Sequence, residues 1–233
     1  MKILFLSEYF HPHWTGLAKS ILNAAIRLQE RGHTCAVLTT KFDKNLPTVE
    51  TYKNIGIYRS LPLIQVSGTK YSATIVFRFI SMVKVYDLIF INCPNSNVLP
   101  FTLISRLFGK QVVVFSSGDL ILPKGWTNRI VEMIHDFSML ASCTLAHTVS
   151  NYTHDYAQHS RILRHFMYKF EPLLLPTSNE NEVDAEYDSR MIEIRKRNGV
   201  PYLVLDCHNT RTVIPAALKR EPIDFAGNPL SRV

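Results

Sequence analysis

The fold is decided by residues 1–40, MKILFLSEYFHPHWTGLAKSILNAAIRLQERGHTCAVLTT. Residues 2–7 form a short, continuous apolar run, which is typical of a strand buried on both faces. Apolar residues then recur at helical spacing over residues 17–31, and Gly32 ends this pattern. Residues 34–39 are again strand-like. A strand, a glycine-bearing loop, a helix and a second strand in this order predict a parallel βαβ unit.

The same alternation continues beyond this unit. We expect further strands over residues 55–59, 87–91, 111–115, 143–149 and 172–175, and helices over residues 71–85, 98–107 and 128–140 and from residue 151. Short hydrophobic strands that alternate with helices imply a parallel sheet with helices on both faces. The predicted fold class is therefore α/β, a Rossmann-like doubly wound parallel sheet with a short C-terminal appendage.

The character of the sequence changes near residue 176. Residues 177–188 are acidic and polar and indicate a linker, residues 189–198 are expected to form a short basic helix, and residues 202–205 are strand-like. We therefore divide the chain into a Rossmann-like domain (1–176), an acidic linker with a short helix (177–200) and a truncated or atypical tail (201–233).

The composition excludes several classes of protein. Of the 233 residues, 46% are hydrophobic and 19% are charged, which is the balance of a chain with a buried core and not of a disordered one. No apolar run reaches the length of about 20 residues that crosses a bilayer. The first residues lack the pattern of a signal peptide, so we expect a cytoplasmic location. The four cysteines fall singly, which predicts buried thiols and no metal site.

The net charge of +7 belongs to the N-terminal part of the chain. Residues 1–150 contain 15 Lys and Arg against 8 Asp and Glu, whereas residues 151–233 contain 11 of each kind. A basic surplus attracts nucleic acid, phosphorylated small molecules or anionic lipid head groups. Nucleic acid is not expected, because the sequence lacks patterned aromatic residues for base stacking. Residues 159–170 are basic and amphipathic, which suits either a peripheral contact with an anionic membrane at its inner face or a helix with its apolar side inward.

Two loops are expected to carry most of the chemistry, because ligands of parallel α/β sheets bind beyond the carboxyl ends of the strands. The first loop supplies the candidate site residues Glu8, His13, Thr15 and Gly16. Gly16 opens a helix, where free N–H groups suit a phosphate or a sugar hydroxyl, and a simple tight turn is the alternative. The second loop supplies Ser117, Gly118 and Asp119. Asp119 is the catalytic candidate because it could accept a proton from a substrate hydroxyl, and the alternative is that it caps a local turn.

A third loop contains Ser150, which we expect to cap the helix that follows, with ligand contact as the alternative. The sequence lacks the G-x-G-x-x-G, Walker A and G-x-S-x-G patterns, so it gives no sign of a dinucleotide site, a P-loop or a hydrolase nucleophile.

Several short motifs follow one another in a characteristic order: Tyr9-Phe10, Pro12, Thr15-Gly16, Arg31-Gly-His33, Val37-Leu-Thr39, Asp87-Leu-Ile-Phe-Ile91, Gly109-Lys-Gln-Val-Val-Val114, Gly118-Asp119 and Val149-Ser-Asn-Tyr152. In this order, residues 1–176 resemble the N-terminal lobe of GT-B glycosyltransferases of the family 4 type. The family often has a second glycine where Thr15 stands and a histidine where Ser117 stands, which puts a close backbone approach and a sugar contact in doubt.

The resemblance implies a two-lobed, metal-independent and retaining enzyme of cell-envelope polysaccharide biosynthesis. Its N-terminal lobe would bind a glycan or lipid-linked acceptor, and its C-terminal lobe would hold the nucleotide-sugar donor. After Leu205 we find neither the phosphate loop nor the paired glutamates of that second lobe. We therefore expect an acceptor-binding lobe that is inactive alone and needs no cofactor. It would act on a nucleotide-sugar only together with a donor-lobe polypeptide as partner. The alternative is a non-catalytic module that binds a glycan, a phospholipid or another polyanion.

Overall fold

An eight-stranded sheet organises the structure, which is a computed structural model. The structure describes residues 1–62, 64–66, 69–71, 73–173, 175, 191–197, 200–207 and 210–215. Side chains are described in residues 1–62 and 74–173 and at Leu175. The sheet has the order β10-β9-β8-β7-β1-β2-β4-β3, with strands β1 (Lys2–Leu6), β2 (Thr34–Thr40), β3 (Val49–Tyr52), β4 (Ile55–Ser60), β7 (Leu88–Cys93), β8 (Gln111–Ser116), β9 (Thr148–Asn151) and β10 (Phe170–Pro172). Every neighbouring pair is parallel except β3 and β4, which form an antiparallel hairpin at one edge. The predicted α/β class is confirmed.

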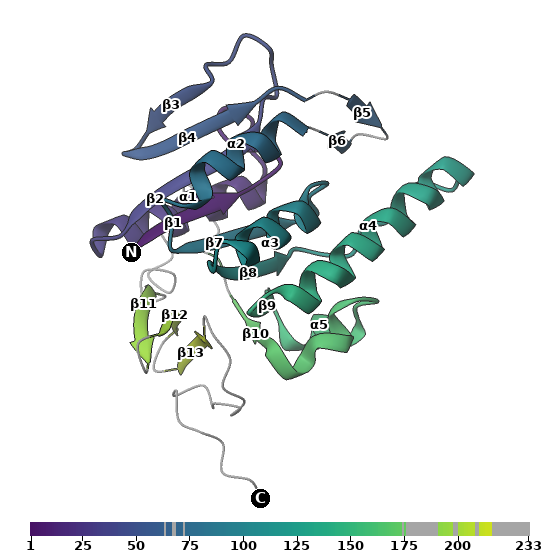
Figure 1. Cartoon of the computed structure of the whole chain (residues 1–233). Helices are drawn as coiled ribbons and strands as arrows, with labels where there is room; N and C mark the ends of the chain where they lie inside the picture. Colours follow the sequence, from purple (N-terminus) through teal and green to yellow (C-terminus); the bar gives the residue numbers. More distant parts are fainter. Residues whose placement is uncertain are drawn as a thin grey trace, which may run out of the picture.

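Helices cover both faces of this sheet (Figure 1). They are α1 (Gly16–Glu30), α2 (Ala73–Val83), α3 (Val98–Leu107), α4 (Trp126–Leu145), α5 (His154–His159) and the 3-10 helix η1 (Leu163–Lys169). One hydrophobic cluster joins α1 to one face, with Leu28 beside Phe5. A second cluster joins α2, α3 and α4 to the other face and includes Phe79 of α2 and Leu4 of β1. Because successive strand residues point to opposite faces, both faces of the parallel strands are apolar and the sheet is doubly wound.

The chain changes direction across the sheet between β1 and β7. It runs outward from β1 through β2 to β4 and then returns through α2 to β7, on the other side of β1. Leu6 at the end of β1 pairs with Leu38 of β2 and with Ile91 of β7, so the three strands end close together. In open α/β sheets, ligands bind beyond the carboxyl ends of the strands at such a switch point.

The end of α4 differs from the sequence prediction. Residues 143–145, which were expected to begin a strand, belong to α4, and β9 begins only at Thr148. Met139 and Cys143 are both buried and lie four positions apart, which is helical spacing. A short run of apolar residues does not by itself distinguish a buried strand from the buried side of a helix.

The basic helix expected over residues 189–198 is also wrong. The structure has a strand there, β11 (Met191–Arg197), which pairs antiparallel with β12 (Val200–Cys207), and β12 in turn pairs with β13 (Thr210–Pro215). Ile192 and Ile194 alternate with charged residues, and this period of two suits a strand. The strand expected at 202–205 is confirmed within β12, whereas residues 177–190 and 216–233 lie outside the described part of the chain.

The sequence did not indicate the antiparallel elements. Lys53 and Asn54 form the turn between β3 and β4 with φ values of 48° and 62°, the left-handed conformation of a two-residue hairpin. A second hairpin joins β5 (Ile64–Val66) and β6 (Thr69–Tyr71). The segment 159–170 contains η1, in which Leu163 and Phe166 are buried, so its apolar residues face inward.

Candidate functional site

The loops that follow β1, β7, β8 and β9 open at one edge of the sheet, because these strands are parallel. The register keeps their ends level: Cys93 of β7 pairs with Ser116 of β8, and Phe115 pairs with Ser150 of β9. The first and second loops therefore lie at the same edge, separated by β7. We treat this carboxyl edge as the candidate site.

Helix α1 presents its N-terminus at this edge. Thr15 is its N-cap, and the Thr15 hydroxyl accepts a hydrogen bond from the Ala18 N–H at 3.1 Å. Gly16 follows, and a Cβ placed on it would meet no atom within 4 Å. The space beside the first turn is therefore open, as a close approach of a ligand to the backbone requires.

The two histidines of the first loop are held by aromatic neighbours. The His13 ring stacks on Phe42 at a centroid distance of 4.1 Å, and the His11 ring stacks on Tyr52 at 4.2 Å. Glu8 is half-buried, and its carbonyl accepts a hydrogen bond from the Thr39 hydroxyl at 3.2 Å. Stacking and backbone contacts thus fix the loop against β2 and the β3–β4 hairpin.

A buried arginine that the sequence analysis missed supports the same loop. Arg59 of β4 is 1% exposed, and its guanidinium donates to the backbone carbonyls of His11 (2.6 Å) and Pro47 (3.2 Å). It also pairs with the Glu50 carboxylate at 2.5 Å. The signal in the sequence was a lone charge at the end of the strand-like run 55–59, since a buried charge needs such partners.

Asp119 of the second loop already has partners for both carboxylate oxygens. Oδ1 accepts from the Ser160 hydroxyl at 2.7 Å and Oδ2 from the Arg161 N–H at 3.0 Å. The Asp119 N–H donates to the Tyr156 hydroxyl at 2.7 Å. Asp119 therefore caps a turn, as one reading of the sequence held, but this turn lies 41 residues away and not within its own loop.

The neighbours of Asp119 are also engaged. The Ser117 hydroxyl and N–H both donate to the Cys93 carbonyl, at 2.8 and 2.9 Å. A Cβ placed on Gly118 would lie 3.5 Å from the Tyr156 hydroxyl, an ordinary van der Waals distance. The second loop is thus tied to β7 on one side and to α5 on the other.

The expected capping role of Ser150 is wrong. Ser150 is fully buried within β9, and its hydroxyl donates to the Glu171 carbonyl of β10 at 2.7 Å. Thr153 caps α5 instead, because its hydroxyl accepts from the Tyr156 N–H at 3.2 Å. The strand continues two residues beyond the predicted end at Val149, which carries Ser150 into the sheet.

A polar pair lies at the switch point itself, and the sequence analysis did not select it. Asn92 near the end of β7 is 3% exposed, and its side-chain amide donates to the hydroxyl of Ser7 at 3.5 Å. The Ser7 hydroxyl donates in turn to the Tyr9 carbonyl at 2.8 Å. The Oδ1 of Asn92 is buried and has no hydrogen-bond partner within the described part of the chain. The signal in the sequence was a polar residue directly after the apolar run 88–91.

Burial shifts the pKa of several ionisable groups. It raises the pKa of Glu171, on β10, to about 8. It lowers the pKa of His147 to about 4, with a smaller contribution from the nearby Arg106. Burial raises the pKa of the Cys35 and Cys143 thiols to about 12. Cys35, Cys93 and Cys143 are free and buried, as the sequence predicted. Within the ranges described, no three His, Cys, Asp or Glu side chains gather as a metal site would require.

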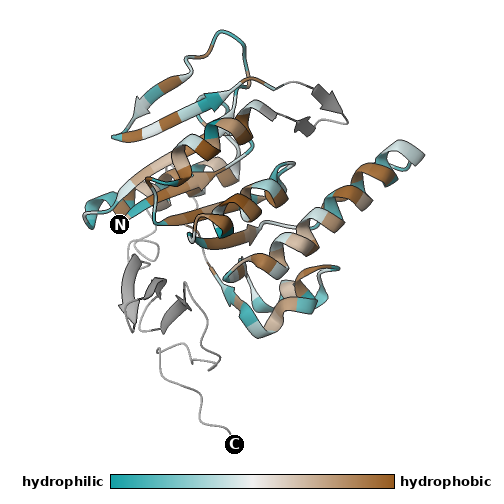
Figure 2. Cartoon of the chain, viewed as in Figure 1, coloured by the Kyte–Doolittle hydropathy of each residue, from teal (hydrophilic) through white to brown (hydrophobic). Residues whose placement is uncertain are grey.

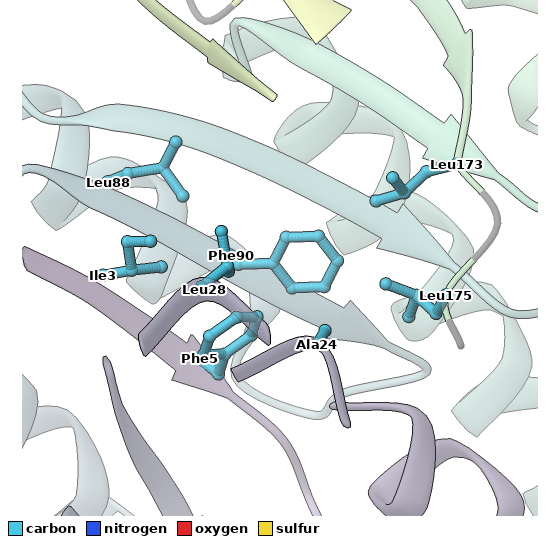
Figure 3. A pocket seen from close by; sticks show the side chains of 8 residues that line it. All are labelled: Ile3, Phe5, Ala24, Leu28, Leu88, Phe90, Leu173 and Leu175. Carbon is cyan, nitrogen blue, oxygen red and sulfur yellow. The ribbon is translucent and has the colours of Figure 1, made fainter. Parts of the chain in front are cut away.

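A cavity between α1 and the sheet is a feature of packing. It is lined by Ile3, Phe5, Ala24, Leu28, Leu88, Phe90, Leu173 and Leu175 (Figure 3). Each of these side chains is apolar, and a phosphate or a sugar needs hydrogen-bonding partners when it leaves water. The candidate site is therefore the polar carboxyl edge and not this cavity.

Comparison with known proteins finds similar folds among solved structures and no similar sequence. No family model matches the chain, and no curated protein matches its sequence. Similar solved structures include the UDP-GlcNAc 2-epimerase from Methanocaldococcus jannaschii, with 13% identity, a TM-score of 0.46 and coverage of 74% of this chain and 45% of the epimerase chain. The catalytic domain of starch synthase IV from Arabidopsis thaliana, bound to ADP and acarbose, has 12% identity, a TM-score of 0.48 and coverage of 76% and 51%.

A third similar structure is an alpha-glucosyltransferase in complex with UDP and a 13-mer DNA, with 10% identity, a TM-score of 0.47 and coverage of 76% of this chain and 43% of that one. The chain thus matches about half or less of the length of each of the three. At these identities and TM-scores the likeness says nothing about substrate or reaction.

Proposed function

We propose that the chain is the acceptor-binding lobe of a retaining GT-B glycosyltransferase, with residues 1–176 as its Rossmann-like domain. In this proposal the carboxyl edge holds a glycan or lipid-linked acceptor, and a nucleotide-sugar-binding lobe completes the transfer. The observation that carries the proposal is that the hydrogen-bonded pair of Ser7 and Asn92 and the open N-terminus of α1 lie at the same carboxyl edge of the sheet, at its switch point. The order of the motifs in residues 1–176 supports the same assignment.

The chemistry of this edge suits a hydroxylated ligand. A sugar hydroxyl both donates and accepts hydrogen bonds, so it can use the Asn92 carbonyl oxygen and the open first turn of α1. Transfer from a nucleotide-sugar also requires stabilisation of the leaving diphosphate, which supplies a large part of the catalysis. No phosphate loop is recognisable in the sequence, so we expect binding without turnover from this chain alone.

The test is a transfer assay paired with a binding assay. The purified chain is incubated with UDP-glucose, UDP-N-acetylglucosamine or GDP-mannose and simple saccharide acceptors, and the product is measured by mass spectrometry. The expected result is no transfer, together with saccharide binding in titration calorimetry. Robust turnover would show that the chain contains a complete active site, and absence of any saccharide binding would contradict the acceptor role.

A non-catalytic binding module is the second candidate, and the state of Asp119 favours it. Both carboxylate oxygens of Asp119, the catalytic candidate, accept hydrogen bonds from the protein. Asp119 therefore holds the second loop in place. Such a module would bind a glycan, a phospholipid or a polyanion with equal affinity whether or not a donor lobe is present. Titration with single-stranded RNA separates a polyanion binder, since its affinity would fall steeply with salt.

A further inference from the structure

Helix α4 projects from the body of the molecule. Its buried residues are Met139, Ser142 and Cys143, all near its C-terminal end, and none of residues 126–138 is buried. Figure 1 shows α4 extending beyond the sheet, and Figure 2 shows hydrophobic residues along the extending part. None of the described helices, α4 included, is long and apolar enough to pass through a membrane. The N-terminal part of α4 therefore presents apolar side chains that the body of the molecule does not cover.

The exposed apolar residues of α4 have the spacing of a coiled coil. They are Trp126, Ile130, Met133, Phe137 and Leu140, with exposed fractions of 77%, 47%, 64%, 68% and 41%. Alternating steps of four and three residues keep all five on one side of the helix, at the a and d positions of a heptad repeat. A second helix covers such a stripe by inserting its own apolar side chains between them. We call these five residues the α4 seam.

Two residues of opposite charge flank the α4 seam, one heptad apart. Arg129 and Asp136 each directly precede an a position and so occupy g positions, where paired helices form ion pairs. Arg129 is exposed and has no ion pair within the described residues. Asp136 pairs with Arg161 at 3.2 Å, and its side chain remains 29% exposed. The complementary partner is therefore a helix with an acid opposite Arg129 and a base opposite Asp136.

A second copy of α4 has an apolar seam that fits the first when the two helices run antiparallel. Reversal of one helix places the a positions of one copy opposite the d positions of the other. In one such register, Trp126 faces Phe137 of the second copy and Ile130 faces Met133. The two-fold axis repeats both layers, so the seam has aromatic pairs at its two ends and aliphatic pairs at its centre.

The same register also brings the charged positions together, because g positions lie opposite g positions in an antiparallel pair. Arg129 of each copy faces Asp136 of the other, which gives two equivalent ion pairs. An antiparallel register shifted by one heptad would instead place Asp136 opposite Asp136 of the second copy. A parallel pair would place Arg129 beside the apolar Ile134. Charge complementarity thus favours one antiparallel register.

We propose that the chain forms a dimer in solution through the α4 seam, with the two copies of α4 antiparallel. The overlap covers residues 126–137, which is about 18 Å of helix. It lies in the projecting part of α4, so the two sheets remain apart. A contact of this length is small for a protein interface, and we expect a dissociation constant on the order of 10 µM. The dimer does not depend on the proposed sugar chemistry.

The test is sedimentation velocity of the full chain at concentrations from about 1 to 200 µM. We expect monomer at the lowest concentration and dimer at the highest. Met133→Glu places a carboxylate in both central layers and should raise the dissociation constant about a hundredfold. Arg129→Glu replaces two ion pairs with two like-charge contacts and should raise it about tenfold. Met133 and Arg129 are exposed, so both variants should keep the fold of the monomer.

Two control variants match these changes away from the α4 seam. Phe77→Glu places the same carboxylate at a residue of α2 that is 72% exposed, and Lys44→Glu reverses the charge of an exposed lysine before β3. Both should dimerise as the unaltered chain does, and thermal melting verifies that every variant is folded. A chain that remains monomeric at the highest concentration, or a dimer that Met133→Glu leaves intact, overturns the proposal. A dimer that Phe77→Glu weakens as much as Met133→Glu also overturns it, and one that is insensitive to Arg129→Glu contradicts the antiparallel register.

Discussion

The hydroxyl of Ser160 donates a hydrogen bond to Oδ1 of Asp119 at 2.7 Å, across 41 residues of sequence. This bond and the one from the Arg161 N–H to Oδ2 connect the loop after β8 to the turn after α5. Hydrogen bonds to a charged group contribute more to stability than those between neutral groups. The shape of the second loop of the candidate site therefore depends on a remote turn.

Asp119→Ala should destabilise the protein by about 2 kcal/mol, because it leaves the Ser160 hydroxyl and the Arg161 N–H without their acceptor. Urea unfolding measures the loss. Asp155→Ala, at a carboxylate that is 91% exposed, is the matched control and should change the free energy of unfolding little. If Asp119→Ala abolished an activity while stability stayed unchanged, a catalytic role would be supported and the fixing role contradicted.

The pair of Arg59 and Glu50 should show strong non-additivity. Glu50→Gln leaves a buried guanidinium without its counter-charge, which typically costs about 3 kcal/mol. The double variant Glu50→Gln with Arg59→Met should be less destabilised than the sum of the two single variants. Denaturant unfolding of all four proteins completes the cycle. Additive effects would mean that the two side chains do not stabilise each other.

The positions of the parallel strands along the chain were largely predictable from the sequence, whereas the contacts that fix the site were not. Continuous apolar runs such as 87–91 and 111–115 mark buried parallel strands, and parallel strands bring their following loops to one edge. The partner of Asp119 could not be predicted, because Ser160 meets it only after α4, β9 and α5 have been placed.

The errors of the prediction also arise from long-range contacts that the local sequence does not reveal. Ser150 resembles a helix cap by its position in the sequence, but tertiary pairing with β10 extends the strand past it. Residues 191–197 contain an alternation too short to separate a strand from a charged helix until β12 pairs with it. Local pattern gives the type of most elements, and long-range pairing decides their ends.

Glu171 should make the protein less stable as the pH rises. Its pKa is raised from 4.5 to about 8 by burial, so the folded chain holds a proton that the unfolded chain releases between these values. The loss amounts to about 1.4 kcal/mol for each pKa unit of the shift. Glu171→Gln removes the titration, and its free energy of unfolding should exceed that of the unaltered chain above pH 8 and match it near pH 4.5. Parallel pH profiles of the two proteins would contradict this assignment.

His147 should make the protein less stable as the pH falls. Burial lowers its pKa from 6.5 to about 4, and its Nδ1 accepts a hydrogen bond from the Val112 N–H at 3.1 Å. The unfolded chain therefore takes up a proton first as the pH falls from 6.5 to 4, and stability is lost over that window. In His147→Gln this part of the acid-induced loss should disappear. The control His159→Gln changes a ring that is 78% exposed and should leave the profile unchanged.

Asn92→Leu should separate binding from stability at the switch point. The side-chain oxygen of the buried Asn92 has no hydrogen-bond partner in the described part of the chain. If the amide were rotated by 180°, its nitrogen would be the atom without a partner. An unsatisfied buried polar group is costly, so the leucine, of similar volume, should raise the free energy of unfolding by about 1 kcal/mol. If a sugar hydroxyl donates to this oxygen, the same variant should bind saccharides more weakly in calorimetry. A variant that is less stable than the unaltered chain, or that binds saccharides with unchanged affinity, would show that Asn92 serves the packing of β7 and not a ligand.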